Sequence, residues 1–228
     1  MTWGKYAFTL AEVLITLGII GVVAAMTIPN LMAAHKAQRL RAQFLKSYST
    51  VQQVFKQMEA DDVSLDPAAY EGRSFYLTFM TYLKGAMNCQ ALRGRKVKSC
   101  YDDVSGYSYK AYDGKNNITN HILDDGQILL QDGTLLLFEN SGSNINGKKV
   151  FVSIDLNNWS GPPNRAGFDL FTFEFLDGEL RVMGDRGTTY PAELYCAPNG
   201  TRAYNGMGCA YKAKNATEYF KHLVKYIK

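Results

Sequence analysis

The sequence lacks the residue patterns around which most active sites are built. No G-x-S-x-G, H-E-x-x-H, P-loop or dinucleotide-binding glycine motif occurs in its 228 residues. Histidine is scarce, and the three that are present, His35, His121 and His222, show no matching spacing. We therefore expect that the protein is not an enzyme.

A strong excess of one charge is also missing. Lys and Arg together number 25 and Asp and Glu 21, which leaves a formal net charge of +4. A balance this small does not indicate a dedicated nucleic-acid binder. There is no repeat of fixed period and no low-complexity tract, and the length suits one globular domain with an anchoring segment.

Cysteine is limited to 4 residues, and none of them forms the C-x-x-C pairs typical of zinc sites. Cys89 lies eleven residues before Cys100, and Cys196 lies thirteen before Cys209. Both pairs lie in loop-like sequence. An even number of locally paired cysteines predicts two disulfides, and hence a globular part in an oxidising compartment.

The most informative feature is a long apolar segment at residues 8–34, which carries one charge, Glu12. As a helix it would be roughly 40 Å long, enough to cross a hydrocarbon core of ~30 Å with some tilt. Apolar residues then recur at steps of three and four from Ala37 to Met58. This pattern predicts that the helix continues as an amphipathic second half at residues 35–60 and packs one face on a globular head.

The charges that flank the apolar segment and the cysteines predict opposite sides of the membrane for the C-terminal part of the chain. Lys5 precedes the segment, whereas His35, Lys36, Arg39 and Arg41 follow it. The positive-inside rule would then leave the large C-terminal part in the cytoplasm. Composition alone leaves the two orientations open.

The remainder of the chain favours an antiparallel sheet. Short strand-like runs alternate with turn signals at residues 107–112, 128–131, 134–139, 150–155, 170–176 and 180–183. Q-D-G-T and L-D-G-E at residues 131–134 and 176–179 are typical of hairpin turns. Shorter helices are expected at residues 68–86 and 215–228. The overall prediction is an α+β fold.

The N-terminal segment resembles that of a type IV prepilin, a family that includes pilus subunits and the pseudopilins of type II secretion systems. The resemblance covers about the first 30 residues, with FTLAE at residues 8–12 and IIGVVAAMTIPNL at residues 19–31. It implies a pilin-like fold with the long helix laid on the sheet. It also implies the following division of the chain: a leader at 1–7, a membrane-spanning and filament-core helix at 8–34, its amphipathic continuation at 35–60, and an extracytoplasmic head at 61–228.

The resemblance also implies roles for individual residues. A prepilin peptidase would cleave between Ala7 and Phe8 and methylate the new Phe8 amine, although the family prefers glycine where this chain has Ala7. Glu12 would then pair with the Phe8 amine of a neighbouring subunit and set the axial register of the filament. Pro29 is expected to kink or locally melt the helix.

Partners and location follow from the same resemblance. The expected partners are other pilin or pseudopilin subunits, the prepilin peptidase and an inner-membrane assembly platform. Before assembly the subunit would cross the inner membrane once, with its head in the periplasm or outside the cell, and afterwards it would be part of a filament. The Cys196–Cys209 segment is similar to the C-terminal disulfide loop of type IV pilins.

One loop of the head offers a candidate metal site. Residues 155–169 resemble a loop that binds calcium in some pseudopilins, and the oxygen ligands would come from Asp155, Asn157, Asn164 and Asp169. Asn158 stands where the family usually has glycine. The other interpretation, which the sequence favours, is that Asx turns and prolines shape a long loop between two strands.

The leading prediction is a structural subunit, a minor pilin or a pseudopilin-like protein. A surface pilus, a secretion filament and a DNA-uptake pilus are all compatible with it. One alternative is a binding module for DNA or substrate at a filament tip, using Arg93, Arg95, Lys96 and Lys98. The other is a membrane-anchored extracellular domain that does not polymerise, which would suit the N-x-S/T sites at Asn117, Asn158, Asn199 and Asn215.

Overall fold

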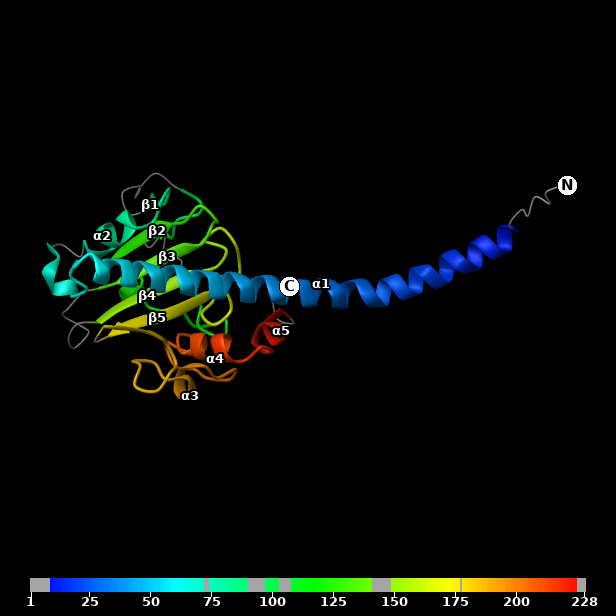
Figure 1. Ribbon diagram of the computed structural model, residues 1–228. Coiled ribbons are helices and arrows are strands. Elements are labelled where there is room, and N and C mark those ends of the chain that lie inside the picture. The colour runs from blue at the N-terminus through cyan, green and yellow to red at the C-terminus, as the bar shows by residue number, and fades with distance from the viewer. Residues whose placement is uncertain are drawn as a thin grey trace.

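The protein consists of a globular head and one long helix, half of which projects from the head (Figure 1). The computed structural model describes residues 9–71, 74–89, 97–102, 108–140, 149–176 and 178–224. Helix α1 runs without interruption over Leu10–Ala60. It ends where the backbone N–H of Asp61 donates to the carbonyl of Gln57, and Asp62 then adopts a positive φ of 55°. The helix therefore ends at residue 60, the limit expected from the sequence.

The head contains a six-stranded antiparallel sheet in which each strand pairs with its neighbours in sequence. The strands are β1 (Met87–Asn88), β2 (Gly126–Leu129), β3 (Leu135–Glu139), β4 (Lys149–Asp155), β5 (Leu170–Leu176) and β6 (Glu179–Val182). The β2–β3 and β5–β6 connections are the two predicted hairpins. The predicted α+β fold, a long N-terminal helix packed on an antiparallel sheet, is therefore confirmed.

Two of the expected elements differ in the structure. Residues 108–112 do not form a strand of the sheet, because the backbone of Lys110 makes only isolated bridges to Asn117 and Arg165; residue 107 lies outside the described residues. The helix expected at residues 68–86 is shorter, with a 3₁₀ turn η1 (Pro67–Ala69) followed by α2 (Phe75–Thr81). Gly85 adopts a φ of 70° just after α2, a conformation that ends a helix.

The remaining helices are short. They are η4 (Asn120–Ile122), α3 (Ala192–Tyr195), α4 (Cys209–Asn215) and α5 (Tyr219–Val224). Both α4 and α5 contact α1, and α4 also contacts β5. The C-terminal helix expected at residues 215–228 is present in shorter form as α5, which buries Phe220 and Leu223. Residues 225–228 lie outside the described residues.

The second half of α1 supplies the core on one face of the sheet. Phe44 is 0% exposed, and its ring lies 4.9 Å from that of Phe171 and 5.9 Å from that of Phe220. Further along, Phe55 stacks on Phe175 at 4.2 Å. The other face carries a second cluster that includes Leu137, Phe151 and Tyr109. Since apolar groups cover both faces, the central strands are buried on both sides.

Candidate functional site

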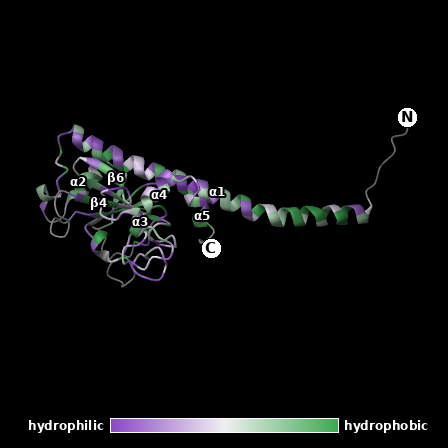
Figure 2. Ribbon diagram, turned by 90° about the horizontal axis from the view of Figure 1, so that it is seen from below, coloured by the Kyte–Doolittle hydropathy of each residue, from purple (hydrophilic) through white to green (hydrophobic). Residues whose placement is uncertain are grey.

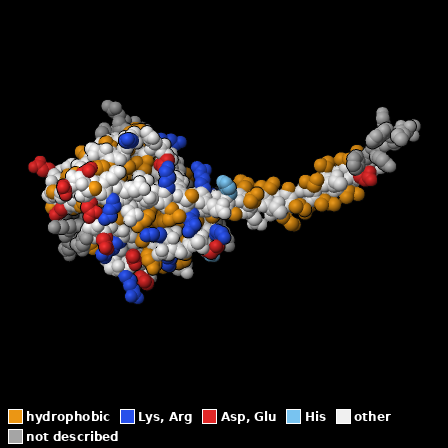
Figure 3. Space-filling view, viewed as in Figure 1, with side chains coloured by type: hydrophobic (Ala, Val, Ile, Leu, Met, Phe, Trp, Pro, Cys, Tyr) orange, Lys and Arg blue, Asp and Glu red, His pale blue; other side chains and the backbone are white. Residues whose placement is uncertain are grey.

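The first half of α1 is a candidate interaction surface because none of its residues is buried against the rest of the chain that the structure describes. No residue of the segment 10–34 is buried, and large apolar side chains such as Leu10 (78% exposed) point outward along it. Figure 2 shows this projecting segment as predominantly hydrophobic, and Figure 3 shows apolar side chains all along it. By length and composition the helix can cross a membrane. The structure therefore indicates a membrane anchor, and its layout is compatible with a pilin-like architecture.

Glu12, the one acidic residue of this segment, caps the start of α1. The backbone N–H and the hydroxyl of Thr9 each donate to the Glu12 carboxylate at 2.8 Å, and the Glu12 N–H donates back to the Thr9 hydroxyl at 3.2 Å. This reciprocal arrangement is a capping box, whose T-x-x-E signature is present at residues 9–12. The predicted cleavage and methylation at Ala7 and Phe8 lie outside the described residues.

Pro29 does not interrupt α1, because residues 25–33 are all helical. The expectation of a locally melted helix is wrong for the subunit by itself. Proline removes one backbone donor, the one that would bond to the carbonyl of Ala25. Two neighbouring side chains bond to other carbonyls of the preceding turn. The Thr27 hydroxyl donates to Val23 and the Asn30 amide to Met26, at 2.9 and 3.3 Å. Figure 1 shows this half of α1 as a gently curved rod.

Both predicted disulfides are present in the structure. Cys89 is bonded to Cys100, and Cys196 to Cys209, and the structure has no free cysteine. The second bridge closes a loop of the size for which a stabilisation of about 3 kcal/mol is expected. Two disulfides indicate an oxidising compartment for the head, outside the cytoplasm.

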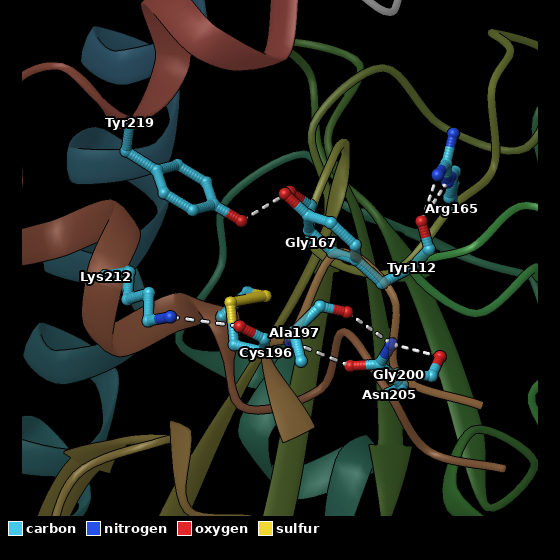
Figure 4. The surroundings of a disulfide bond; sticks show 10 residues. Tyr112, Arg165, Gly167, Cys196, Ala197, Gly200, Asn205, Lys212 and Tyr219 are labelled. Atoms are coloured by element: carbon cyan, nitrogen blue, oxygen red, sulfur yellow. Dashed lines mark hydrogen bonds between the residues drawn. A yellow bond between two sulfur atoms is a disulfide. The ribbon is translucent and has the colours of Figure 1, made fainter. Parts of the chain in front are cut away.

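The loop between Cys196 and Cys209 is held by more than the bridge (Figure 4). The side-chain amide of Asn205, which is fully buried, donates to the carbonyls of Ala197 and Gly200 at 2.8 and 2.7 Å. Its oxygen accepts the Ala197 N–H at 3.1 Å. Lys212 on α4 donates to the carbonyl of Cys196 at 3.0 Å. The loop therefore has one fixed shape against α4.

The candidate calcium residues lie at the end of β4, which Asp155 closes, and in the loop that leads to β5. The carboxylates of Asp155 and Asp169 are 0% and 1% exposed. Asp155 accepts the hydroxyl of Tyr109 at 2.7 Å, and Asp169 accepts the backbone N–H groups of Asn164 and Arg165 at 2.8 and 2.7 Å. Burial raises the pKa of Asp155 well above its usual range, and the nearby charge of Asp169 adds to the effect. Burial also raises the pKa of Asp169 to about 6.

The oxygen atoms around this pair suit a hard cation. The side-chain oxygens of Asn157 and Asn164 are buried and have no hydrogen-bond partner. Two carboxylates and two amide oxygens are ligands of the type that Ca²⁺ prefers. Asn158 adopts a φ of 55°, a conformation that glycine and asparagine tolerate. The backbone N–H of Asn157 donates to Asp155 as in an Asx turn, so the turn interpretation is confirmed and calcium binding stays a prediction.

Without divalent cations, the free energy of unfolding is expected to fall as the pH rises from 4 to 7. A carboxyl whose pKa is raised binds its proton more tightly in the folded state, so the folded state loses stability as the group ionises. The change for Asp169, from 3.8 to about 6, corresponds to about 3 kcal/mol. Urea titrations of the full chain in detergent micelles with a chelator, at several pH values, measure this slope.

The Asp169→Asn variant removes one titrating group and should flatten the slope, whereas Asp62→Asn at the exposed end of α1 should leave it unchanged. Added Ca²⁺ should restore stability at pH 7 and have little effect at pH 4.5, where protons compete for the carboxylates. A wild-type slope that persists in the Asp169→Asn variant would contradict this account of the buried pair.

A second acidic cluster was not expected from the sequence. Ligand atoms of Asp124, Asp125 and Glu139 lie within 4.8 Å of one another. The cluster forms because β2 pairs with β3 so that Gly126 lies opposite Phe138, which brings the start of β2 to the end of β3. The adjacent aspartates at 124–125 are the one local signal. We assign no ligand to this cluster.

The basic segment considered for DNA or substrate binding is only partly visible. Arg93, Arg95 and Lys96 lie outside the described residues, and Lys98 is exposed. Binding by these residues therefore stays a prediction.

Comparison of the whole chain with models of protein families, with curated proteins and with solved structures found no match. The case for a function therefore depends on the N-terminal motif, the exposed apolar half of α1 and the disulfide-linked head.

Proposed function

We propose that the protein is a structural subunit of an extracytoplasmic filament, a minor pilin or a pseudopilin-like protein of a type IV pilus or type II secretion system. In this proposal residues 1–7 are a leader that a prepilin peptidase removes, and residues 8–34 are first a membrane span and then part of the filament core. Residues 35–60 connect this segment to the head, residues 61–228. Other pilin or pseudopilin subunits and an inner-membrane assembly platform are its partners.

One observation supports the proposal most strongly: α1 is a single helix with two different surroundings. From Ala37 onward it is built into the head, while no residue at 10–34 is buried by the part of the chain that the structure describes. A helix that is apolar on all sides requires lipid or other apolar helices around it. Because the two halves are continuous, packing of the first halves against one another would arrange the heads around a common axis.

The small residues of the apolar half fit such packing. A Cβ placed on Gly18 or Gly21 would meet no atom of the chain within 4 Å, so neither glycine is required by contacts within the subunit. Glycine lets neighbouring helices approach closely in an apolar environment. We infer that both positions lie against helices of other subunits in the filament.

Glu12 has a role both before and after assembly in this proposal. In the subunit by itself its carboxylate caps α1 through Thr9. Removal of residues 1–7 would create an amine at Phe8, and the amine of a neighbouring subunit could then pair with Glu12 in the low-dielectric core. The carboxylate of Glu12 is costly within a membrane when it has no counter-charge. Its pairing with the amine would therefore favour the assembled filament over the single subunit.

The test is site-specific photo-crosslinking in the cells that make the protein. A photoreactive phenylalanine analogue in place of Ile20, which is 62% exposed on the apolar half, should give crosslinks to the apolar helices of other filament subunits. Mass spectrometry of the crosslinked peptides identifies these partners. The same analogue in place of Gln53, which is exposed on the second half of α1, is the matched control for chance collisions. Absence of any protein crosslink from position 20 would contradict the proposal.

A further inference from the structure

A small cavity lies where α1 enters the head. It has a volume of about 220 Å³ and is formed between one face of α1 and the loop that joins β4 to β5. The helix contributes Lys36, Arg39, Leu40 and Gln43, and the loop contributes Asn157, Pro162, Pro163, Phe168 and Asp169.

The cavity has two basic groups without partners. Neither Lys36 nor Arg39 forms a hydrogen bond or an ion pair with any residue that the structure describes, and both are exposed. Of the other polar groups of the lining, Gln43 donates to the carbonyl of Leu156, and the Asp169 carboxylate accepts two backbone N–H groups. The Asn157 amide donates to two carbonyls of its own loop, and its buried oxygen has no partner. The exposed groups left available to a ligand at the mouth of the cavity are the two cations, which suit an anion such as a phosphate.

The position of the cavity along α1 indicates where this anion comes from. The exposed apolar segment, residues 10–34, is about 37 Å long as a helix, whereas a hydrocarbon core is ~30 Å and a bilayer with its headgroups about 40–45 Å thick. Lys36 and Arg39 follow this segment directly, so a helix inserted through it would hold them at the level of the headgroups. The head begins at the same level, because Ala37 is the first buried residue of α1. Figure 3 shows Lys and Arg side chains on the head near the point where the helix leaves it.

We propose that this cavity binds the phosphate of an anionic phospholipid in the outer leaflet of the membrane that α1 spans. The two cations contact the phosphate, and Leu40 and the prolines of the loop contact the apolar part of the headgroup region. The lipid thereby fixes the depth and rotation of the head before assembly. By the positive-inside rule, Lys36 and Arg39 would be expected on the cytoplasmic side of the span, whereas the proposed orientation places them on the other side. Binding of an anionic lipid gives these two residues a role there. The inference rests on the proposed membrane insertion.

The test uses the full chain in nanodiscs of phosphatidylcholine and phosphatidylglycerol at 3:1. After extraction into mild detergent, the lipids that remain bound are counted by native mass spectrometry. The wild type should retain phosphatidylglycerol at least fivefold above its share of the bilayer, since each basic residue near an anionic surface strengthens association about fivefold. Lys36→Gln with Arg39→Gln should abolish this enrichment.

Two control variants separate the cavity from general charge attraction. Lys46→Gln with Lys56→Gln removes the same charge from the same helix, at lysines that pair with Asp132 and Glu59, and should keep the enrichment. Leu40→Trp retains both cations but fills part of the cavity, and should reduce the enrichment. Near-ultraviolet circular dichroism verifies that each variant is folded.

Several outcomes would overturn the inference. These are an equal loss of enrichment in both double variants, full enrichment in Leu40→Trp, and displacement of the lipid by soluble glycerol 3-phosphate, which would indicate a site for free phosphate esters. A chain that inserts without enriching phosphatidylglycerol contradicts this inference alone. A chain that does not insert contradicts both this inference and the proposed function.

Discussion

If the protein assembles as proposed, replacing Glu12 with glutamine should reduce filament assembly at least tenfold while leaving the subunit in the membrane. Glutamine retains an oxygen that can accept the hydrogen bonds from Thr9, so the start of α1 should persist. What is lost is the negative charge available to the amine of a neighbouring subunit. Within an apolar filament core that amine would then be buried without a counter-charge, which is strongly unfavourable. Filaments sheared from cells and quantified by immunoblot provide the measurement.

The matched control for this substitution is Glu59→Gln, which removes a carboxylate near the other end of the same helix. Glu59 forms an exposed ion pair with Lys56 at 2.7 Å, and surface pairs of this kind contribute little. This variant should assemble as the wild type does. If Glu12→Gln also formed filaments at wild-type levels, Glu12 would have only the capping role seen in the subunit by itself.

Replacing Phe44 with alanine should lower the free energy of unfolding by about 3–5 kcal/mol, the range observed when a buried phenylalanine is truncated. Phe44 is 0% exposed and joins three elements, because its ring contacts Phe171 and Phe173 on β5 and Phe220 on α5. Its removal leaves a cavity where the helix is joined to the head. Urea denaturation of the full chain in detergent micelles, followed by near-ultraviolet circular dichroism, measures the loss.

Gln53→Ala is the control for Phe44→Ala, because Gln53 is exposed on the same helix and should cost less than about 0.5 kcal/mol. A loss below about 1 kcal/mol for Phe44→Ala would indicate that the head is stable without this half of α1. In that case the helix would be an attachment and not part of the core. The proposed arrangement of the heads around a common filament axis would then lack its structural basis.

The elements that could be predicted from the sequence are those with strong local patterns. The apolar stripe from Ala37 to Met58 identified the buried face of α1, and Phe44, Val51, Phe55 and Met58 are buried as expected. The predicted strand at residues 170–176 has the same limits as β5. D-G turn sequences located the two hairpins because glycine adopts a positive φ there, as Gly133 and Gly178 do.

Other features depend on contacts between distant segments. The tyrosines at residues 108–112 are typical of a strand. Tyr109 is instead buried in the cluster on the sheet face opposite α1, where its hydroxyl donates to Asp155. β1 is two residues long and exists only through its pairing with β2. The closeness of Asp155 to Asp169 arises from the pairing of β4 with β5, although the ligand types were evident in sequence. The T-x-x-E pattern of the capping box is present at residues 9–12, but it lies within a continuous apolar segment, so the sequence does not mark Thr9 as the start of the helix.

The mature N-terminus, determined by mass spectrometry of protein extracted from membranes of the producing cells, tests the central claim most directly. The account predicts an N-terminal peptide that begins with N-methylated Phe8, which would leave Glu12 five residues into the mature chain, four residues after the new amine. A chain that still begins at Met1 would contradict it. Glu12 would then have no terminal amine to pair with, and the protein would be a membrane-anchored domain that does not polymerise.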